Sequence, residues 1–283
     1  TAHVAGGTHH AFKDYGEGFC IFSGKVFDLI GIVTLTLMRN TSDIISSTCL
    51  IGSDIAVAAN VLLERHSQSS TANNSSSPSI RRILVIDLDV HQGMERFDVT
   101  MRYNLLNKLL MNNARMTNLG NGNAALFQND DRVQTFSMHC SGNYFSKKET
   151  SDLDVGLPVG CNDETYVSTL RYWLRRIEQH DFDTTIIPTS ETRGKSFDLI
   201  FFQAGVDIHN DDRLGRLCIT TSGISQRNSM VYEFAHRMKC PLVITMGGGY
   251  PNGNGKEGSS SSIIEAHTRV YCDAHEFLTA AYR

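Results

Sequence analysis

The sequence contains no closely spaced pair of cysteines, no long apolar run and no polybasic tail. Its 7 cysteines are scattered without a C-x-x-C pair, which argues for free thiols in a reducing compartment and against a disulfide framework. The longest apolar run, residues 26–38, is interrupted by Asp28 and is too short to cross a bilayer. Because no signal peptide is visible either, we expect no membrane partner and a nuclear or cytoplasmic location.

A strong net charge is also missing, since the 283 residues carry a formal charge of only −4. Tight electrostatic binding to nucleic acid is therefore not expected, whereas basic substrates such as lysine-rich peptides suit a mildly acidic protein. The hydrophobic fraction of 41% is enough for a sizeable core, and a single α/β domain can reach this length. The first residue is Thr rather than Met, so we expect the natural chain to begin earlier.

Residues 83–93, which read I-L-V-I-D-L-D-V-H-Q-G, organise the rest of the chain. The first half is a continuous apolar, β-branched run, as in a parallel strand buried on both faces. Asp87, Asp89 and His91 alternate along the second half, so an extended strand presents their side chains on one face. Ligands of open α/β sheets collect at the carboxyl ends of strands, where carboxylates and an imidazole suit zinc. The alternative is that the aspartates cap the next element and that His91 is a surface histidine.

Strands alternate with helices along the sequence, which predicts a doubly wound parallel β-sheet flanked by helices in one domain, residues 1–283. Asp54 and Asn162 stand where two of the helices need N-caps. Further strands are expected at 132–139, 154–158, 197–205 and 241–245, and helices at 54–65, 162–180, 222–238 and 263–281. Polar or glycine-rich composition predicts loops at 1–22, 67–79 and 252–262.

Other polar groups follow strands or lie in glycine-rich segments. Asp207 follows the strand expected at 197–205, and with Asp89 and His91 it makes three ligands, which leaves open the fourth position of a catalytic zinc. The adjacent His9 and His10 suit proton transfer, because imidazole titrates near neutrality. Tyr250 follows three glycines, whose backbone can approach a ligand closely. Alone, each feature has a simpler interpretation as a surface or turn residue, but together they meet the requirements for ligands, base and oxyanion donor.

Six motifs occur in a fixed order along the chain: G-G-T-H-H-A-F, G-F-C-I-F, V-I-D-L-D-V-H-Q-G, A-G-V-D, D-R-L-G and G-G-G-Y-P. In this order they resemble the zinc-dependent histone deacetylase superfamily, which has the arginase/deacetylase fold. Gln92 follows His91 where many members carry a second histidine, so the chain is most similar to class IV deacetylases and their bacterial relatives. The resemblance covers nearly the whole chain apart from its loops.

The resemblance implies a role for each matching residue. Asp89, His91 and Asp207 match the zinc ligands. His10 matches the main general base and His9 its electrostatic companion.

Further positions match the pocket and its surroundings. Tyr250 matches the tyrosine that binds the developing oxyanion. Gly18 matches a glycine whose carbonyl accepts the substrate amide, and Phe19 matches a wall of the lysine tunnel, with Tyr144 or Phe145 as alternatives for the other wall.

Asp87 matches the carboxylate behind His9, which also belongs to a buried potassium site. The other histidines lack such a context and are interpreted as structural or solvated: His3, His66, His180, His236, His267 and His275, with His139 and His209 nearer the rim of the sheet.

The activity implied is zinc-dependent hydrolysis of the amide of N-ε-acyl-lysine in histones or other proteins. Zinc polarises an amide carbonyl and lowers the pKa of water, a histidine accepts the proton, and a tyrosine stabilises the oxyanion. The length of the acyl chain stays open. Two alternatives also stay open, a small-molecule amidohydrolase of the acetylpolyamine type and a member that keeps the fold without catalysis.

The chain departs from the family at three places. Residues 23–53 separate two motifs that are normally continuous, and residues 94–119 interrupt H-Q-G-N-G after Gly93. Excising residues 94–120 restores the phrase, so our hypothesis is that both segments are translated introns, which sequencing the mature transcript tests. If the segments are genuine loops instead, we expect Asn121 to be the polar partner of His10 only where Gly93 and Gly120 come close in space. Family members also carry a stretch before the His-His loop, so we expect a sheet that lacks edge strands here.

Overall fold

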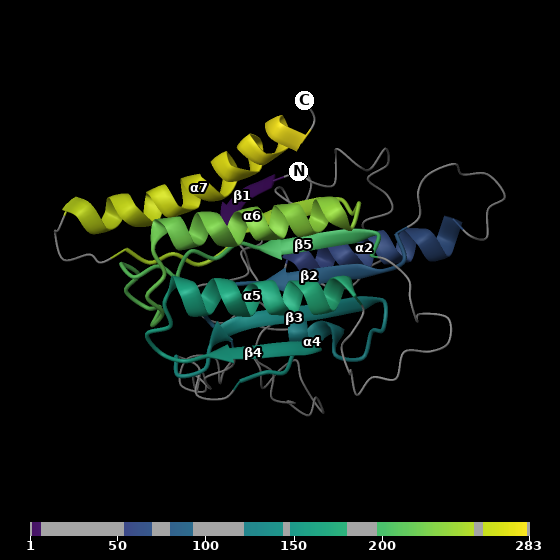
Figure 1. Cartoon of the computed structure of the whole chain (residues 1–283). Coiled ribbons are helices and arrows are strands. Elements are labelled where there is room, and N and C mark those ends of the chain that lie inside the picture. Colours follow the sequence, from purple (N-terminus) through teal and green to yellow (C-terminus); the bar gives the residue numbers. More distant parts are fainter. Residues whose placement is uncertain are drawn as a thin grey trace, which may run out of the picture.

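A six-stranded parallel β-sheet forms the centre of the molecule, with the strand order β1-β6-β5-β2-β3-β4 (Figure 1). The computed structural model describes residues 2–6, 54–69, 80–92, 122–143, 148–179, 197–251 and 257–281. The strands are β1 (Ala2–Gly6), β2 (Ile83–Asp87), β3 (Val133–Cys140), β4 (Leu153–Leu157), β5 (Leu199–Gln203) and β6 (Leu242–Met246). The parallel sheet that the alternating pattern predicts is therefore confirmed.

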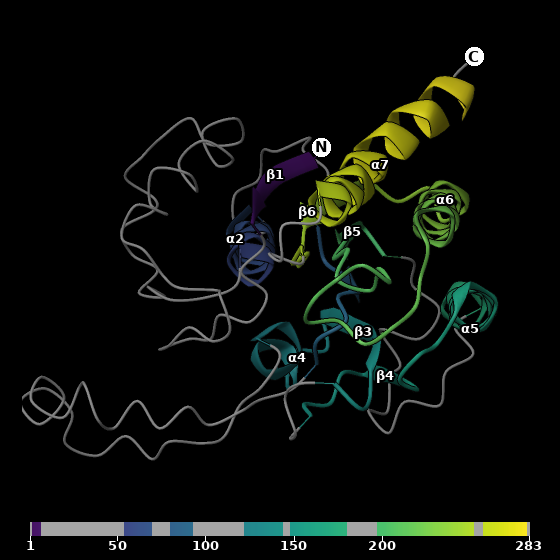
Figure 2. The ribbon, with the colours of Figure 1, turned by 90° about the vertical axis from the view of Figure 1, so that its left-hand side faces the viewer.

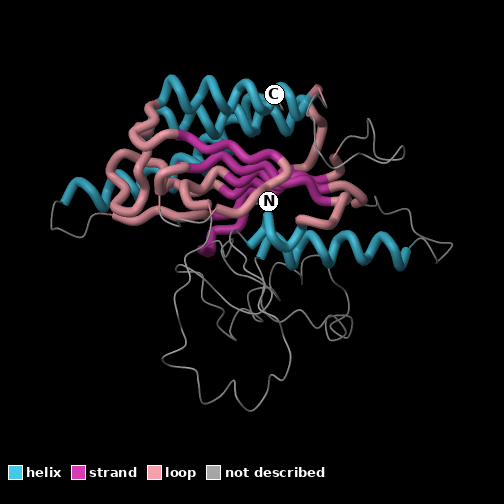
Figure 3. The backbone as a smooth tube through the Cα atoms, turned by 90° about the horizontal axis from the view of Figure 1, so that it is seen from below, coloured by secondary structure: helices cyan, strands magenta, loops and turns pink. Residues whose placement is uncertain are grey.

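Helices cover both faces of this sheet (Figures 2 and 3). α5 (Asp163–Glu178), α6 (Thr221–Arg237) and α7 (Glu257–Ala281) lie on one face, and α2 (Asp54–Ser69) with the short α4 (Gly122–Phe127) lies on the other. None of the helices in the described part of the chain is long and apolar enough to cross a membrane.

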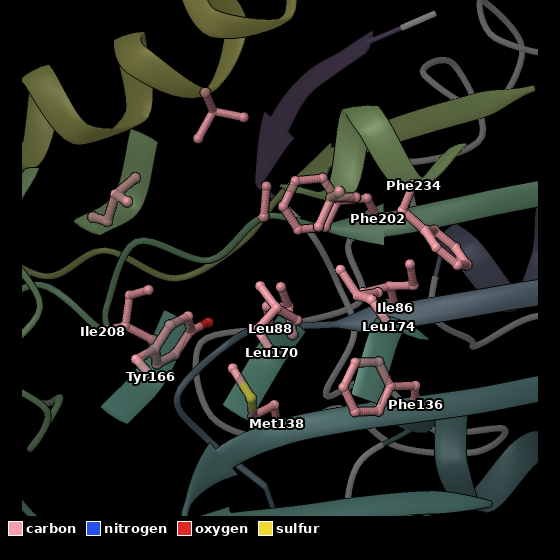
Figure 4. Close-up of a cluster of buried hydrophobic side chains, with 14 of the residues drawn as sticks. Ile86, Leu88, Phe136, Met138, Tyr166, Leu170, Leu174, Phe202, Ile208 and Phe234 are labelled. Carbon is pink, nitrogen blue, oxygen red and sulfur yellow. The ribbon is translucent and has the colours of Figure 1, made fainter. Parts of the chain in front are cut away.

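The central strand β2 separates two hydrophobic clusters. Leu84 and Ile86 belong to the larger cluster with α5, α6 and α7 (Figure 4), whereas Ile83 and Val85 belong to the smaller one with α2. Side chains of a strand alternate between its faces, so an uninterrupted apolar run is what a strand covered on both sides requires. Each of these side chains is fully buried, which stabilises the fold by about 1.5–3 kcal/mol per residue.

The register of the sheet brings three strand ends to one edge. Asp87 of β2 pairs with Gln203 of β5, and Gln203 pairs in turn with Thr245 of β6. The residues that follow these three positions therefore leave the sheet side by side. This edge is where the sequence predicts the site.

Asn162 caps α5, as the sequence predicts. Its side chain accepts a hydrogen bond from the backbone N–H of Thr165 at 3.1 Å, which satisfies one of the free donors of the first turn. Thr220 caps α6 in the same way through Gly223. Both helices thus begin within one residue of their expected starts.

The loop predictions were wrong at three places. Residues 2–6 form β1, which pairs with the outer edge of β6 at Ala2↔Ile244 and His3↔Thr245, because an unpaired strand edge is satisfied by any extended segment that reaches it. The polar residues 67–69 complete α2, and residues 257–262 begin α7. Extending a helix costs far less than starting one, so serine-rich ends can continue a helix that an apolar face holds in place. The proposed insertions at 23–53 and 94–119 lie outside the described residues.

Candidate metal centre

Three buried side chains converge beyond the carboxyl ends of β2 and β5. Asp89 and His91 follow β2, Asp207 follows β5, and one ligand atom of each lies within 4.8 Å of the others. Nδ1 of His91 is 2.8 Å from Oδ2 of Asp207 and 3.4 Å from Oδ1 of Asp89. In the described part of the chain, this is the one group of three or more such residues with the spacing of a metal site.

Backbone N–H groups hold the carboxylates in place. Asp89 Oδ1 accepts from the N–H of His91 at 3.1 Å, and Asp207 Oδ1 accepts from the N–H of Val90 at 2.9 Å. Asp87 Oδ1 accepts from the N–H of Asp89 at 3.2 Å, so Asp87 and Asp89 each order the residue two positions further on, whereas Asp207, which follows β5, holds the same segment from there. The chain after β2 is thus folded around its own acidic side chains.

The charges of this group need a cation. Burial raises the pKa of Asp207, and the neighbouring carboxylate of Asp89 raises it further, to about 8. Burial lowers the pKa of His91, but its hydrogen bonds to Asp207 and Asp89 outweigh this and raise it to about 10. Two buried carboxylates are costly without a positive charge between them, whether a proton on His91 or a metal ion. Two carboxylate oxygens and one imidazole nitrogen are a zinc ligand set with a fourth position open, so the residues present fit that metal.

Glycines let the ends of β5 and β6 approach these carboxylates. A Cβ on Gly205 would overlap the side chain of Asp89, and a Cβ on Gly248 would overlap Oδ2 of Asp207. The N–H of Gly248 donates to Asp89 Oδ2 at 2.8 Å, and its carbonyl accepts from the N–H of Val206 at 2.7 Å. Glycine is therefore required in the A-G and G-G-G motifs, because a side chain there would overlap the carboxylates.

Tyr250 lies beside the ligand group. Its ring is 6.0 Å from the ring of His91, centroid to centroid, and nearly perpendicular to it. Its backbone N–H donates to Oδ2 of Asp212, and its carbonyl accepts from the N–H of Arg213 at 2.8 Å. The structure therefore places the ring of Tyr250 next to the ligand group, where the sequence predicts an oxyanion donor.

The remaining residues of the expected site divide into two groups. Asp87 is buried at the end of β2, where its carboxylate accepts from the N–H of Asp89. His9, His10, Gly18, Phe19 and Asn121 lie outside the described residues, as do Tyr144 and Phe145. Their roles therefore stay predictions.

Sequence reasoning missed one residue near the centre, Asp212, and left the position of a second, His267, open. Asp212 holds the backbone of Tyr250, although its motif D-R-L-G carried no assigned role. His267 of α7, which the sequence predicts to be structural or solvated, is structural, because it packs against Gly249, where a Cβ would overlap its Nε2. Burial and the charge of Arg227 lower the pKa of His267 to about 4, so it is neutral at pH 7. His267 lies four residues after Ile263 and three before Val270, both buried, and this helical spacing indicates the inner face of α7.

Comparisons with known proteins show which family the chain resembles. Residues 119–266 match the family described as histone deacetylase domain. An uncharacterized protein of Picosynechococcus sp. is 32% identical over 247 residues, which is 87% of this chain and 55% of that protein. Histone deacetylase 2 of Arabidopsis thaliana is 24% identical over 252 residues, 87% of this chain and 43% of that protein. The chain thus spans about half the length of these curated relatives.

The fold is shared with solved structures. The crystal structure of an HDAC homolog from Aquifex aeolicus superimposes with a TM-score of 0.56 at 18% sequence identity, covering 96% of this chain and 51% of that one. At this identity the likeness establishes the arrangement of the sheet and its helices, while the chemistry has to be argued from the side chains.

Proposed function

The chain belongs to the histone deacetylase family, whose domain matches residues 119–266, and on that premise we propose that it is a zinc-dependent hydrolase of acylated lysine. The observation that carries the proposal is the buried group of Asp89, His91 and Asp207 with the ring of Tyr250 beside it. Ligands and an oxyanion donor at one sheet edge are what amide hydrolysis requires.

Asp89, His91 and Asp207 would hold the zinc ion through two carboxylate oxygens and Nδ1 of the imidazole. When bound there, zinc supplies a Lewis acid that polarises the amide carbonyl and makes water more acidic. We propose potassium near Asp87 as a second, structural ion, since this carboxylate is buried and accepts from the backbone N–H of Asp89.

The chain's own residues would handle the charge and the proton. Tyr250 donates its phenolic O–H to the oxyanion of the tetrahedral intermediate, a contact whose loss costs roughly a hundredfold or more in rate. His10, assisted by His9, accepts the proton of the attacking water and returns one to the leaving amine. The products are a carboxylate and a free lysine amine.

The substrate we propose is acyl-lysine in histones or other proteins, bound through Gly18 and Phe19, in a nuclear or cytoplasmic setting. A class IV type is supported by Gln92, which stands where many members carry a second histidine. Its Nε2 donates to Oδ1 of Asp154 at 2.9 Å and to the hydroxyl of Ser151 at 3.2 Å, so a neutral amide is accommodated here as a buried donor.

The proposal is tested with the full chain loaded with zinc. Lysine peptides that carry acetyl or longer acyl groups are incubated with the protein, and the free amine is measured with and without a chelator. We expect turnover that the chelator abolishes and added zinc restores. Acetylpolyamines serve as the alternative substrate. Turnover of acetylpolyamines alone would mean that the substrate is a small molecule and not a protein. One equivalent of bound zinc without turnover of any acyl-lysine contradicts the proposal.

A further inference from the structure

The D-R-L-G turn, residues 212–215, connects the metal centre with Tyr250. We propose that Asp212 is a positioning residue, which fixes Tyr250 relative to the ligand Asp207. This inference rests on the proposed function, since it concerns the same oxyanion donor. It assigns a role to the one motif near the centre that the chemistry above leaves unused.

Both carboxylate oxygens of Asp212 are engaged. Oδ1 accepts from the backbone N–H of Leu214 at 2.8 Å and of Gly215 at 2.7 Å, which closes the turn. Oδ2 accepts from the N–H of Tyr250, 38 residues further along the chain. The side chain is buried, with 7% of its surface exposed, so little water competes for these three donors. A single carboxylate thus ties the turn to the tyrosine loop.

A second contact completes the attachment of Tyr250. The N–H of Arg213 donates to the carbonyl of Tyr250 at 2.8 Å, and Asp212 forms an antiparallel bridge with Pro251. The peptide groups on both sides of the tyrosine Cα are therefore held by consecutive residues of one turn. Three glycines precede Tyr250, and their backbone is intrinsically permissive, so these bonds restrict where the phenol lies.

The other side of the turn touches the metal centre. A Cβ on Gly215 would overlap the carbonyl oxygen of Asp207, so the turn packs directly on the backbone of that ligand. The same four residues contact the ligand Asp207 through Gly215 and Tyr250 through Asp212. Their geometry consequently sets the separation between the phenol and the ligand group.

The rate should depend on this separation. An oxyanion donor is effective only within about 2.7–3.1 Å of the developing charge, and a displacement of about 1 Å costs on the order of a hundredfold in rate. A carboxylate suits the task because it accepts on both oxygens. An amide in its place accepts on one side only and presents an N–H₂ group to the other donor.

Asp212→Asn is the test, because the amide oxygen can still close the turn while its nitrogen opposes the N–H of Tyr250. We expect kcat to fall about ten- to a hundredfold, with KM and zinc content within about twofold of the unmodified protein. Asp211→Asn, the same change at the neighbouring residue, is the control and should leave kcat within about twofold. Equal effects of the two substitutions overturn the proposal, as does loss of zinc in Asp212→Asn.

A double-mutant cycle separates positioning from a general structural effect. In the Tyr250→Phe background the phenol is absent, so Asp212→Asn should lower the remaining rate by no more than about twofold. If it lowers that rate by the same factor as in the unmodified protein, Asp212 acts independently of Tyr250 and the proposal is wrong. Should Asp212→Asn fail to fold, Asp212→Ser replaces it, since a serine hydroxyl can close the turn but is too short to reach Tyr250.

Hydrogen–deuterium exchange tests the attachment without any turnover. The N–H of Tyr250 should exchange at least about tenfold faster in Asp212→Asn than in Asp211→Asn, because its buried acceptor is lost. Unchanged exchange overturns the positioning role even if the enzyme is active. Faster exchange in a protein that hydrolyses no acyl-lysine supports the attachment and refutes only the proposed function.

Discussion

The N–H of Gly248 donates to Oδ2 of Asp89 at 2.8 Å, across 159 residues of sequence. Through this bond the loop that carries Tyr250 is attached to a residue of the candidate metal centre. The carbonyl of Gly248 accepts from the N–H of Asp207 as well, at 3.2 Å. One peptide segment thus contacts the carboxylate of Asp89 and the backbone of Asp207, so the loop that carries Tyr250 and the candidate metal centre are built as a unit.

This attachment predicts that metal and turnover can be separated by mutation. His91→Ala removes one of three ligands and should lose the zinc, whereas Tyr250→Phe removes only the phenolic hydroxyl. Tyr250→Phe should therefore retain zinc while kcat falls by roughly a hundredfold or more. Zinc is measured by elemental analysis of the dialysed proteins. Equal zinc content in both variants contradicts the ligand assignment.

Gly248→Ala should weaken metal binding without removing a ligand. The added methyl would overlap Oδ2 of Asp207, so either the carboxylate or the loop has to move. We expect zinc affinity to fall about ten- to a hundredfold, as when other supports of metal ligands are lost. Competition with a chromophoric chelator measures the affinity. Gly142→Ala is the matched control, because its methyl would meet only a methyl group of the exposed Val159. Equal affinities of the two variants would refute the steric argument.

His139 should make stability depend on pH. Burial lowers its pKa to about 4, the charge of Lys148 adds to this, and Asp154 opposes it. In the unfolded chain the imidazole of His139 binds a proton below about pH 6.5, whereas in the folded chain it does so only below about pH 4. The free energy of unfolding therefore falls as the pH drops through this window. Between pH 7.5 and 5.0 the free energy of unfolding falls by about 2 kcal/mol because of His139.

Over the same pH range, the free energy of unfolding of His139→Gln should fall by about 2 kcal/mol less than that of the unmodified protein. Urea unfolding followed by circular dichroism measures it. His275→Gln, which removes an exposed histidine of α7, is the control. Parallel pH dependence in the unmodified protein and His139→Gln contradicts the prediction.

The cap of α5 should contribute measurably to stability. Asn162→Ala removes the acceptor of the Thr165 N–H and should lower the free energy of unfolding by about 1 kcal/mol. Asn162→Asp keeps an acceptor in place and adds a negative charge at the helix N-terminus, so it should be neutral or stabilising. Chemical denaturation compares the two. An Asn162→Ala protein as stable as Asn162→Asp would contradict the cap's role.

The sequence by itself determined the parts of the molecule that local pattern controls. A continuous apolar run can be satisfied only between two covered faces, so residues 83–87 could be predicted as a central strand. Asp87, Asp89 and His91 are two residues apart, and side chains at this spacing in an extended chain lie on one face, so they could be predicted to lie together. Asn162 could be predicted as a cap because its effect reaches only three residues along the chain.

Only the tertiary structure decided which distant groups meet. His91 contacts Asp207 across 116 residues, and Asp212 contacts Tyr250 across 38, and neither pairing is visible in the spacing of one element. β1 and His267 are defined by what they pack against, the edge of β6 and Gly249. The physical reason is range: propensity and periodicity act over a few residues, whereas a hydrogen bond or a close approach depends on where the whole chain brings its segments together.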